Sequence, residues 1–370
     1  MNKTLYSLAK AYTEASLDSV FSENDLICIL SSRGVPYYVS IVENAFAAYR
    51  GEKGLTGYLA LSLQEDDASE LEYIDLQQAQ ECLLGIMGND ASELEEADRK
   101  AVEESGVDFG DAGLPQFRSK LQYQFPWYIT EEETEDLILI MRALLFAKGY
   151  FAAFNKKSKT NSFSFWLDSL GLKDQAKKEY MPCITKEGDE FTVTTRVLQD
   201  EAYGFTYPQA YFTNEERKLA FKRMRAKPGK VYYYMIGLLP EPMMGQKSER
   251  PVYPIFSLIY DPQSHMILDV YIVEDYEKEH GLFISRLLEI FEKEGKPQAI
   301  HCFGKRTLAL LSQMGKQVGI MVVEGTQKEE MEKLVMEMLE DLYADHEHEH
   351  EHGPDCSCHH DHDHDHDHHH

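Results

Sequence analysis

Apolar residues recur along the chain at two spacings, and the two alternate in a way typical of mixed α and β structure. Within residues 1–155, short apolar runs at Asp25–Leu30 and Pro36–Val42 predict strands. A long helix is expected to begin after Thr130, which is a good N-cap with Glu133 at the capping-box position. These elements predict a mixed α+β N-terminal domain.

The segment 230–343 has the most regular order of predicted elements. Strands are predicted at Val231–Leu239, Val252–Tyr260, Met266–Val273, Gln298–Phe303 and Val318–Val323, and helices at Glu277–Glu294, Lys305–Met314 and Gln327–Tyr343. Three strands in a meander are thus followed by helix, strand, helix, strand and helix. Because this is the element order of the ribonuclease-H-like fold, the C-terminal domain resembles that fold in topology.

Residues 156–229 are expected to form a connector that ends in a basic helix. The helix should begin near Asn214, and the basic residues of this stretch are Arg217, Lys218, Lys222, Arg223, Arg225 and Lys227. Such a cluster in an acidic protein can dock an acidic partner or a phosphate backbone. It can also be a solvated helix face whose cations pair with the protein's own carboxylates, and we favour this second interpretation.

The charge of the chain limits its partners. The 370 residues carry a formal net charge of −27, to which the residues after Ala344 contribute −9 and the rest about −18. A field of this sign repels nucleic acid and anionic membranes unless a local basic patch opposes it. The sequence therefore disfavours nucleic acid as a partner.

The sequence also bears on location. No apolar run approaches the roughly 20 residues that cross a bilayer, and the first residues lack the apolar core and cleavage site of a secretory signal. Cys28, Cys82, Cys183 and Cys302 stand singly in apolar contexts, which is typical of reduced core thiols. We expect a cytoplasmic protein that spans no membrane.

The residues that could carry catalysis do not form a known pattern. A two-metal nuclease of the ribonuclease-H-like fold needs carboxylates in the middle of its first strand and at the end of its fourth, and neither predicted strand has one. Asp261, Asp269 and Glu324 fall at a turn, within a strand and after a strand. His301 and Cys302 are adjacent on a strand, so their side chains point to opposite faces. The domain is expected to be catalytically silent, and no organic cofactor is predicted.

Several segments of the first half resemble an uncharacterised family of bacterial proteins, a domain of unknown function of the DUF7309 type. They are Pro36–Val42, Ala48–Leu55, Glu95–Arg99, Pro115–Ser119 and Phe125–Tyr128. The block from about Val231 to Glu340 resembles the second domain of the same architecture, of the DUF6930 type. The resemblance implies a cytoplasmic bacterial protein with this two-domain order. It implies no reaction and no catalytic residue.

The final segment, 344–370, is expected to be disordered because it has almost no apolar residue to bury. Its candidate metal ligands are His346, His348, His350, His352, Cys356, Cys358, His359, His360, His362, His364, His366 and His368. Imidazole suits divalent metals such as zinc and nickel, and thiolate suits zinc. The composition is similar to the His-rich termini of nickel and zinc accessory proteins. Alternatively, the segment is a solubilising acidic tail or, in part, an expression tag.

Together these patterns favour a non-enzymatic cytoplasmic binding protein whose tail buffers or delivers zinc or nickel. Its expected partners are divalent metal ions and an acidic protein. One alternative is a nucleic-acid-associated protein that uses the silent ribonuclease-H-like domain and the basic helix. Another is a hydrolase whose site is assembled across the domains.

Overall fold

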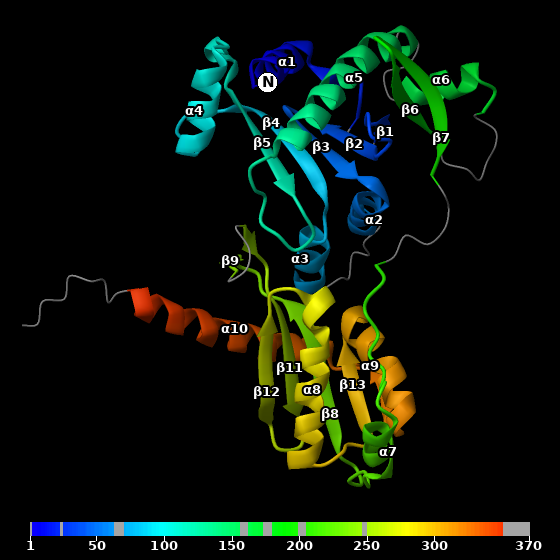
Figure 1. The fold of residues 1–370 in the computed structure, drawn as a ribbon, viewed down its shortest axis with the longest axis vertical. Coiled ribbons are helices and arrows are strands. Elements are labelled where there is room, and N and C mark those ends of the chain that lie inside the picture. Colours follow the sequence, from blue (N-terminus) through cyan, green and yellow to red (C-terminus); the bar gives the residue numbers. More distant parts are fainter. Residues whose placement is uncertain are drawn as a thin grey trace, which may run out of the picture.

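The computed structural model describes residues 2–350 apart from 23–24, 63–69, 156–161, 173–179, 199–204 and 246–249. The described chain forms two domains, which are stacked along the long axis of the molecule (Figure 1). The N-terminal domain is built on a seven-stranded sheet, and the C-terminal domain on a five-stranded sheet. Helices pack against both sheets, so the prediction of an α+β protein is confirmed.

The N-terminal sheet runs in the order β5-β4-β3-β2-β1-β6-β7. All its neighbours are antiparallel except β1 and β6, which are parallel. Its strands are β1 (Leu26–Leu30), β2 (Pro36–Val42), β3 (Ala45–Arg50), β4 (Cys82–Asn89), β5 (Leu114–Lys120), β6 (Tyr180–Glu187) and β7 (Glu190–Val197). The strand predicted at Pro36–Val42 is therefore found with the predicted bounds.

Helices cover both faces of this sheet. They are α1 (Asn2–Ala15), α2 (Gly51–Ser62), α3 (Glu70–Gln78), α4 (Glu96–Ser105), α5 (Glu131–Asn155) and α6 (Ser162–Ser169), with short 3-10 helices at Leu17–Ser19 and Gly110–Ala112. α1 and α5 pack on the face that carries Ile27 and Val39. α2 packs on the opposite face, which carries Cys28 and Tyr38.

The predicted capping box begins α5. The Thr130 Oγ1 atom accepts a hydrogen bond from the Glu133 amide at 3.2 Å, and Glu133 accepts one from the Thr130 amide at 2.9 Å. Within the described residues, α5 is the one helix that is long and apolar enough to cross a membrane by length and composition. Leu137, Met141 and Leu144 are nevertheless fully buried within the protein. We therefore assign α5 to the core of the N-terminal domain.

The predicted connector, residues 156–229, is not one structural unit. Its β6 and β7 complete the N-terminal sheet through the parallel pairing of β1 with β6. Its α7 (Glu215–Arg223) packs instead on α9 (Lys305–Val318) of the C-terminal domain. β6 escaped prediction because Pro182 weakens its strand pattern and because its pairing partner lies far away in sequence.

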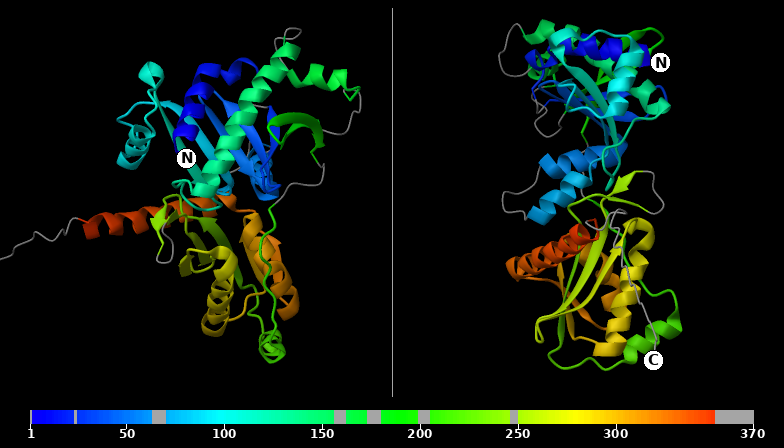
Figure 2. Two further views of the ribbon diagram at one scale, coloured as in Figure 1. Left: turned by 45° about the horizontal axis from the view of Figure 1, so that its top comes forward. Right: turned by 90° about the vertical axis from the view of Figure 1, so that its left-hand side faces the viewer.

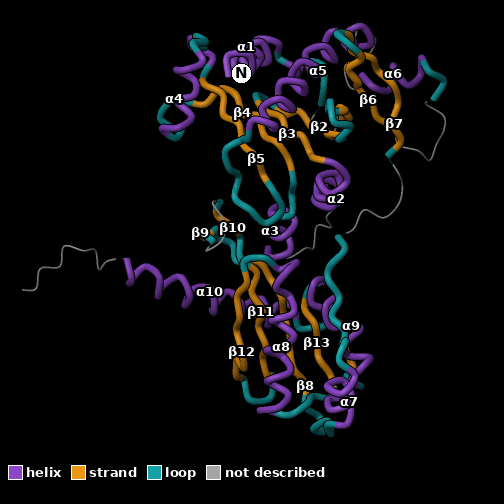
Figure 3. The backbone as a smooth tube through the Cα atoms, viewed as in Figure 1, coloured by secondary structure: helices purple, strands orange, loops and turns teal. Residues whose placement is uncertain are grey.

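The C-terminal sheet runs in the order β12-β11-β8-β13-β14, with β8, β13 and β14 parallel. Its elements are β8 (Val231–Leu238), β11 (Ile255–Asp261), β12 (Met266–Val273), α8 (Tyr276–Glu294), β13 (Ala299–Phe303), α9 (Lys305–Val318), β14 (Met321–Glu324) and α10 (Lys328–His350). This is the predicted order of elements, with a small ribbon of β9 (Met243–Met244) and β10 (Pro251–Val252) added after β8 (Figure 3). The ribonuclease-H-like assignment rests on element order alone and stays a prediction.

α8 and α9 cover one face of the C-terminal sheet, and α10 covers the other. α10 continues to His350, although the sequence predicted disorder from residue 344. A helix that is already anchored extends at little cost. From Lys328, where α10 begins, the sequence has no Gly or Pro until Gly353 and Pro354. α10 thus extends about two helical turns beyond residue 344, where the predicted tail begins.

Candidate functional site

The predicted metal ligands lie at the far end of α10. His346, His348 and His350 fall within the backbone bounds of that helix, and the ligands from His352 onward lie outside the described residues. Across the described part of the chain, no group of three His, Cys, Asp or Glu side chains is arranged to hold a metal ion. The described residues thus offer no preformed cluster of three such ligands.

α10 is firmly attached where it crosses the C-terminal sheet. Met331, Val335 and Leu339 are at most 3% exposed and pack against aromatic residues of β8 and β11. Beyond these residues the helix projects past the edge of the sheet (Figure 1). We call this projecting part of α10, from Glu340 to His350, the arm.

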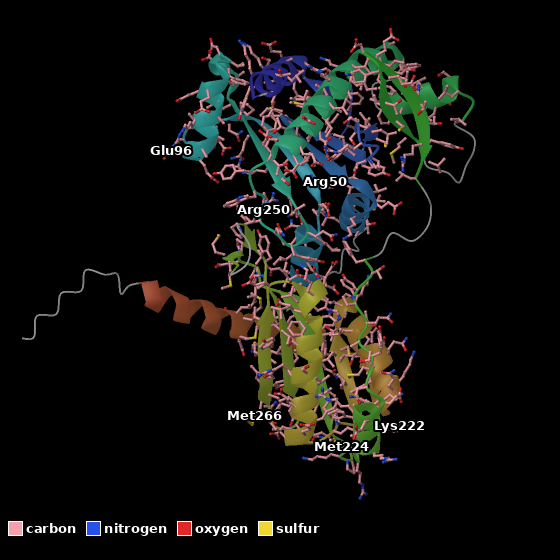
Figure 4. The ribbon with its side chains drawn as sticks, viewed as in Figure 1. Arg50, Glu96, Lys222, Met224, Arg250 and Met266 are labelled. Carbon is pink, nitrogen blue, oxygen red and sulfur yellow. The ribbon has the colours of Figure 1, made fainter. Side chains whose placement is uncertain are left out.

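The predicted basic cluster is found at α7, and most of it is exposed to solvent. Lys218 pairs with Glu215 at 2.5 Å, and the Lys227 ammonium donates to the Glu294 carbonyl. Lys222 and Arg223 close the helix, where cations complement the negative helix end. These cations lie at the end of the C-terminal domain that is remote from the N-terminal domain (Figure 4). The structure thus keeps the cluster available to a partner, but pairs two of its members internally.

The carboxylates near the C-terminal sheet do not converge. Asp261 is buried and accepts a hydrogen bond from Lys230 at 2.7 Å. Burial raises the pKa of its carboxyl, but the hydrogen bonds from Lys230, the Gln263 amide and Ser264 outweigh burial and leave the pKa below its usual value. Asp269 pairs with Arg286 on the β12–α8 side of the domain. Asp261 and Asp269 are thus each committed to a cation of their own, which gives no support to two-metal chemistry.

His301 and Cys302 point to opposite faces of β13, as predicted. The His301 ring stacks on Tyr233, with the ring centres 5.5 Å apart, on the face that α10 covers. Cys302 is fully buried among the residues beneath α8 and α9, and burial raises its pKa to about 12. A thiol with so high a pKa is a poor nucleophile at neutral pH.

Neither of two hollows in the described surface is a convincing substrate pocket. The first, about 160 Å³, lies between α10 and the sheet and is lined by Tyr233, Tyr260, Met331, Leu334 and charged residues of α10. The second, about 430 Å³, is open and is formed by the turns at 88–91 and 110–114. Small-molecule sites usually combine about 300–1,000 Å³ with a mostly enclosed apolar lining, which neither hollow provides.

A polar cluster that no sequence pattern predicted joins the two domains. Arg306, in the first turn of α9, is 2% exposed. Its Nη2 atom donates to Asp75 of α3 at 2.9 Å and to the Tyr123 hydroxyl at 3.0 Å. The rings of Tyr123, Tyr207 and Tyr276 lie 5.2 to 5.3 Å from its guanidinium carbon. A cation enclosed by rings and one carboxylate is held by cation–π and ionic attraction.

The backbone strengthens the same junction. The Tyr253 amide donates to the Tyr123 carbonyl at 2.8 Å, and the Phe125 amide donates to the Pro251 carbonyl at 2.9 Å. These bonds connect the loop after β5 with the chain around β10. The Arg306 cluster therefore fastens the domains together.

Comparison with known proteins agrees with this division of the chain. Residues 3–162 match the model of a domain of unknown function (DUF7309), and residues 220–339 match that of another (DUF6930). No curated protein matches the chain. The matches confirm the resemblance and the domain order predicted from the sequence, while β6 and β7 lie outside both. The chain is therefore a two-domain protein with an N-terminal domain of the DUF7309 family and a C-terminal domain of the DUF6930 family.

Proposed function

We propose that this chain is a non-enzymatic binding protein of the bacterial cytoplasm that buffers or delivers a divalent transition metal of the zinc and nickel class. The observation that carries the proposal is the density of ligands in the tail. Twelve of the fifteen histidines and two cysteines lie between His346 and His370, with carboxylates between most of them. Roughly four such ligands complete a tetrahedral zinc site, so the tail has enough for several ions.

The way in which these ligands are presented favours buffering over catalysis. Many interchangeable ligands without a preformed geometry bind and release metal quickly and discriminate poorly between metals. The carboxylates beside each imidazole can accept its second N–H and so raise the basicity of the ligating nitrogen. Selectivity toward zinc would come chiefly from Cys356 and Cys358.

The attachment of α10 supports the delivery part of the proposal. Leu339 is buried against the C-terminal sheet, and α10 continues for eleven more residues to His350. At 1.5 Å per residue this is a helical arm of roughly 16 Å. A protein that receives the metal could approach the tail without first contacting either domain.

The decisive experiment compares the metal content and affinity of the full chain with those of a truncation that ends at Ala344. The truncation keeps Met331, Val335 and Leu339, so the C-terminal domain should stay folded. A matched control replaces all twelve tail histidines with Gln and keeps every carboxylate. We expect several equivalents of zinc or nickel on the full chain, none on the truncation, and at most the cysteine contribution on the control.

Two results would contradict the proposal. Equal tight binding of one equivalent by the full chain and the truncation would place the site in the body. If the full chain binds neither metal at concentrations below about millimolar at neutral pH, the tail is only a solubilising segment.

A nucleic-acid-associated role is the second candidate, and the exposure of Lys222, Arg223 and Arg225 favours it. This role predicts binding to a duplex DNA probe that weakens steeply with salt and is abolished by charge reversal in the double variant R223E/R225E. Because α7 lies far from α10, the charge reversal should leave metal binding intact (Figure 2). An absence of binding at low salt would exclude this role for duplex DNA.

A further inference from the structure

Three cysteines of the N-terminal domain lie in one row across the seven-stranded sheet. From β7 to β5, the registers place side by side Thr194, Cys183, Cys28, Tyr38, Tyr49, Cys82 and Lys120. Residues paired in this way point to the same face of a sheet. Cys28 and Cys183 are therefore immediate neighbours, whereas two tyrosines separate Cys28 from Cys82.

The spacing of Cys28 and Cys183 suits a covalent bond. Neighbouring strands lie about 4.7–4.9 Å apart. Disulfides join Cα atoms that are about 4.4–6.8 Å apart, so directly paired positions are within this range. Each thiol shifts the pKa of the other: Cys183 raises that of Cys28, and Cys28 lowers that of Cys183. Cys28 is fully buried and Cys183 is 5% exposed.

Arg196 of β7 lies beside the pair on the same face. Its register partner is Met181, two residues from Cys183, and its guanidinium lies 5.6 Å above the ring of Tyr38. The hydrogen bond from Cys28 and the charge of Arg196 outweigh burial and lower the pKa of Cys183 to about 7. Burial raises the pKa of Cys82 to about 12, so that thiol serves as an internal reference.

We propose that Cys28 and Cys183 are a redox-active dithiol, which a hydroperoxide oxidises to a disulfide between β1 and β6. Cys183 is the attacking residue, because it has the greater exposure and the neighbouring cation. Hydrogen peroxide is the fitting member of this class, since it is hardly larger than water and the pair is almost buried.

The reaction balances in two steps. The Cys183 thiolate attacks one oxygen of the peroxide and breaks the O–O bond, which gives a sulfenic acid and, after protonation, one water. The Cys28 sulfur then attacks the Cys183 sulfur, so that the S–S bond forms, the S–O bond breaks and a second water leaves with the thiol proton. Two electrons pass from the two thiols to the peroxide.

The cross-link has a defined structural effect. Strand β6 joins the rest of the sheet only through β1, and β7 pairs only with β6. A bond between Cys28 and Cys183 would therefore fix the β6–β7 hairpin to the sheet. The hairpin is the part of the N-terminal sheet that lies outside both matched families.

The test uses the full-length chain with Cys356 and Cys358 replaced by Ser, which leaves four cysteines. Treatment with hydrogen peroxide, followed by unfolding and thiol titration, should reduce the free thiols from four to two. Peptide mapping should show one Cys28–Cys183 linkage and a mass loss of about 2 Da. C82S should behave in the same way with one thiol fewer, whereas C28S should leave a Cys183 sulfenic acid that dimedone traps.

A second measurement isolates the role of Arg196. In R196Q the rate of oxidation at pH 7 should fall at least about tenfold, because less of Cys183 is thiolate. Near pH 10 the rate of R196Q should approach that of the parent, because Cys183 is then a thiolate in both chains. If the substitution merely disturbed packing, the oxidation rate would stay low at pH 10. Two results would overturn the proposal. One is that the folded chain keeps four free thiols under a treatment that oxidises the unfolded chain. The other is a linkage that involves Cys82 or Cys302.

Discussion

Arg306 and Asp75 form an ion pair at 2.9 Å although 231 residues separate them in sequence. One belongs to the C-terminal domain and the other to α3 of the N-terminal domain, so the pair crosses the junction between the domains. The three tyrosine rings around the guanidinium exclude water from it. The domain junction is therefore a specific, buried contact.

Asp75→Asn should destabilise this junction. The substitution leaves the buried guanidinium without its carboxylate, and the loss of one partner of a buried pair typically costs about 3–5 kcal/mol. Because the Asp75 side chain is 22% exposed, we expect the lower end of this range. Urea unfolding measures the change, and R306M in the same chain should restore part of the loss. The exposed pair of Lys333 and Glu337 provides the control, since E337Q should change stability by less than about 1 kcal/mol.

The contribution of Glu133 should depend on pH. Burial raises the pKa of this carboxyl, but hydrogen bonds from Arg50, Ser119 and Thr130 outweigh it and leave the pKa below its usual value. A carboxyl with a lowered pKa stabilises the fold above its unfolded pKa, about 4.3, and this stability is lost as the pH falls through the folded value.

Glu133→Gln should therefore be less stable than the parent at pH 7, and the difference should shrink below about pH 4. Urea unfolding at pH 7 and at the lowest pH where both chains fold gives the comparison. A constant difference across this range would show that the carboxylate charge is not what stabilises the site. Thr130→Ser, which keeps the capping hydroxyl, should leave the pH dependence unchanged.

Two glycines within helices should respond to alanine in opposite ways. A Cβ atom on Gly54 of α2 would lie 2.6 Å from the Glu81 carbonyl oxygen and 2.7 Å from the Tyr49 carbonyl carbon, whereas Gly149 of α5 has no atom within 4 Å. G54A must push α2 away from the sheet and should cost about 1–3 kcal/mol. G149A should stabilise by about 0.5–1 kcal/mol, because Ala suits a helix better than Gly. Thermal and urea unfolding of the two variants would test the difference in sign.

Metal held by the tail should be released by mild acid. Imidazoles must be neutral to bind, and the carboxylates beside them favour the protonated form, so affinity should fall steeply below about pH 6.5. Competition titrations of zinc at pH 7.5 and 5.5 should differ by more than tenfold in apparent affinity. Replacing Cys356 and Cys358 with Ser should weaken zinc more than nickel. An affinity that is independent of pH would point to carboxylate ligands instead.

Local signals in the sequence were sufficient for much of the fold. Thr130 and Glu133 marked the start of α5, and the apolar run Met266–Val273 predicted β12 with the bounds that it has in the structure. Gly106 ends α4 in the left-handed conformation with φ 66°, as a C-terminal glycine is expected to do. In these places neighbours in sequence supply the stabilising contacts.

The features that escaped prediction depend on distant contacts. β6 is a strand because it pairs with β1, and Arg306 is buried because Asp75 and Tyr123 enclose it. No periodicity within a short window reports such partners. The metal-ligand residues were recognisable for the opposite reason, since their chemistry depends on composition and needs no fold.

The place of β6 beside β1 has a consequence for how the protein is made. During synthesis the first five strands emerge long before β6, and until then β1 is an open edge with unpaired backbone groups, next to the apolar side chains of Leu26 and Cys28. Open edges of this kind recruit other strands and promote aggregation. A fragment that stops at the family boundary near residue 162 would keep that edge permanently, so we expect it to aggregate, whereas a fragment extended past Val197 should remain in solution.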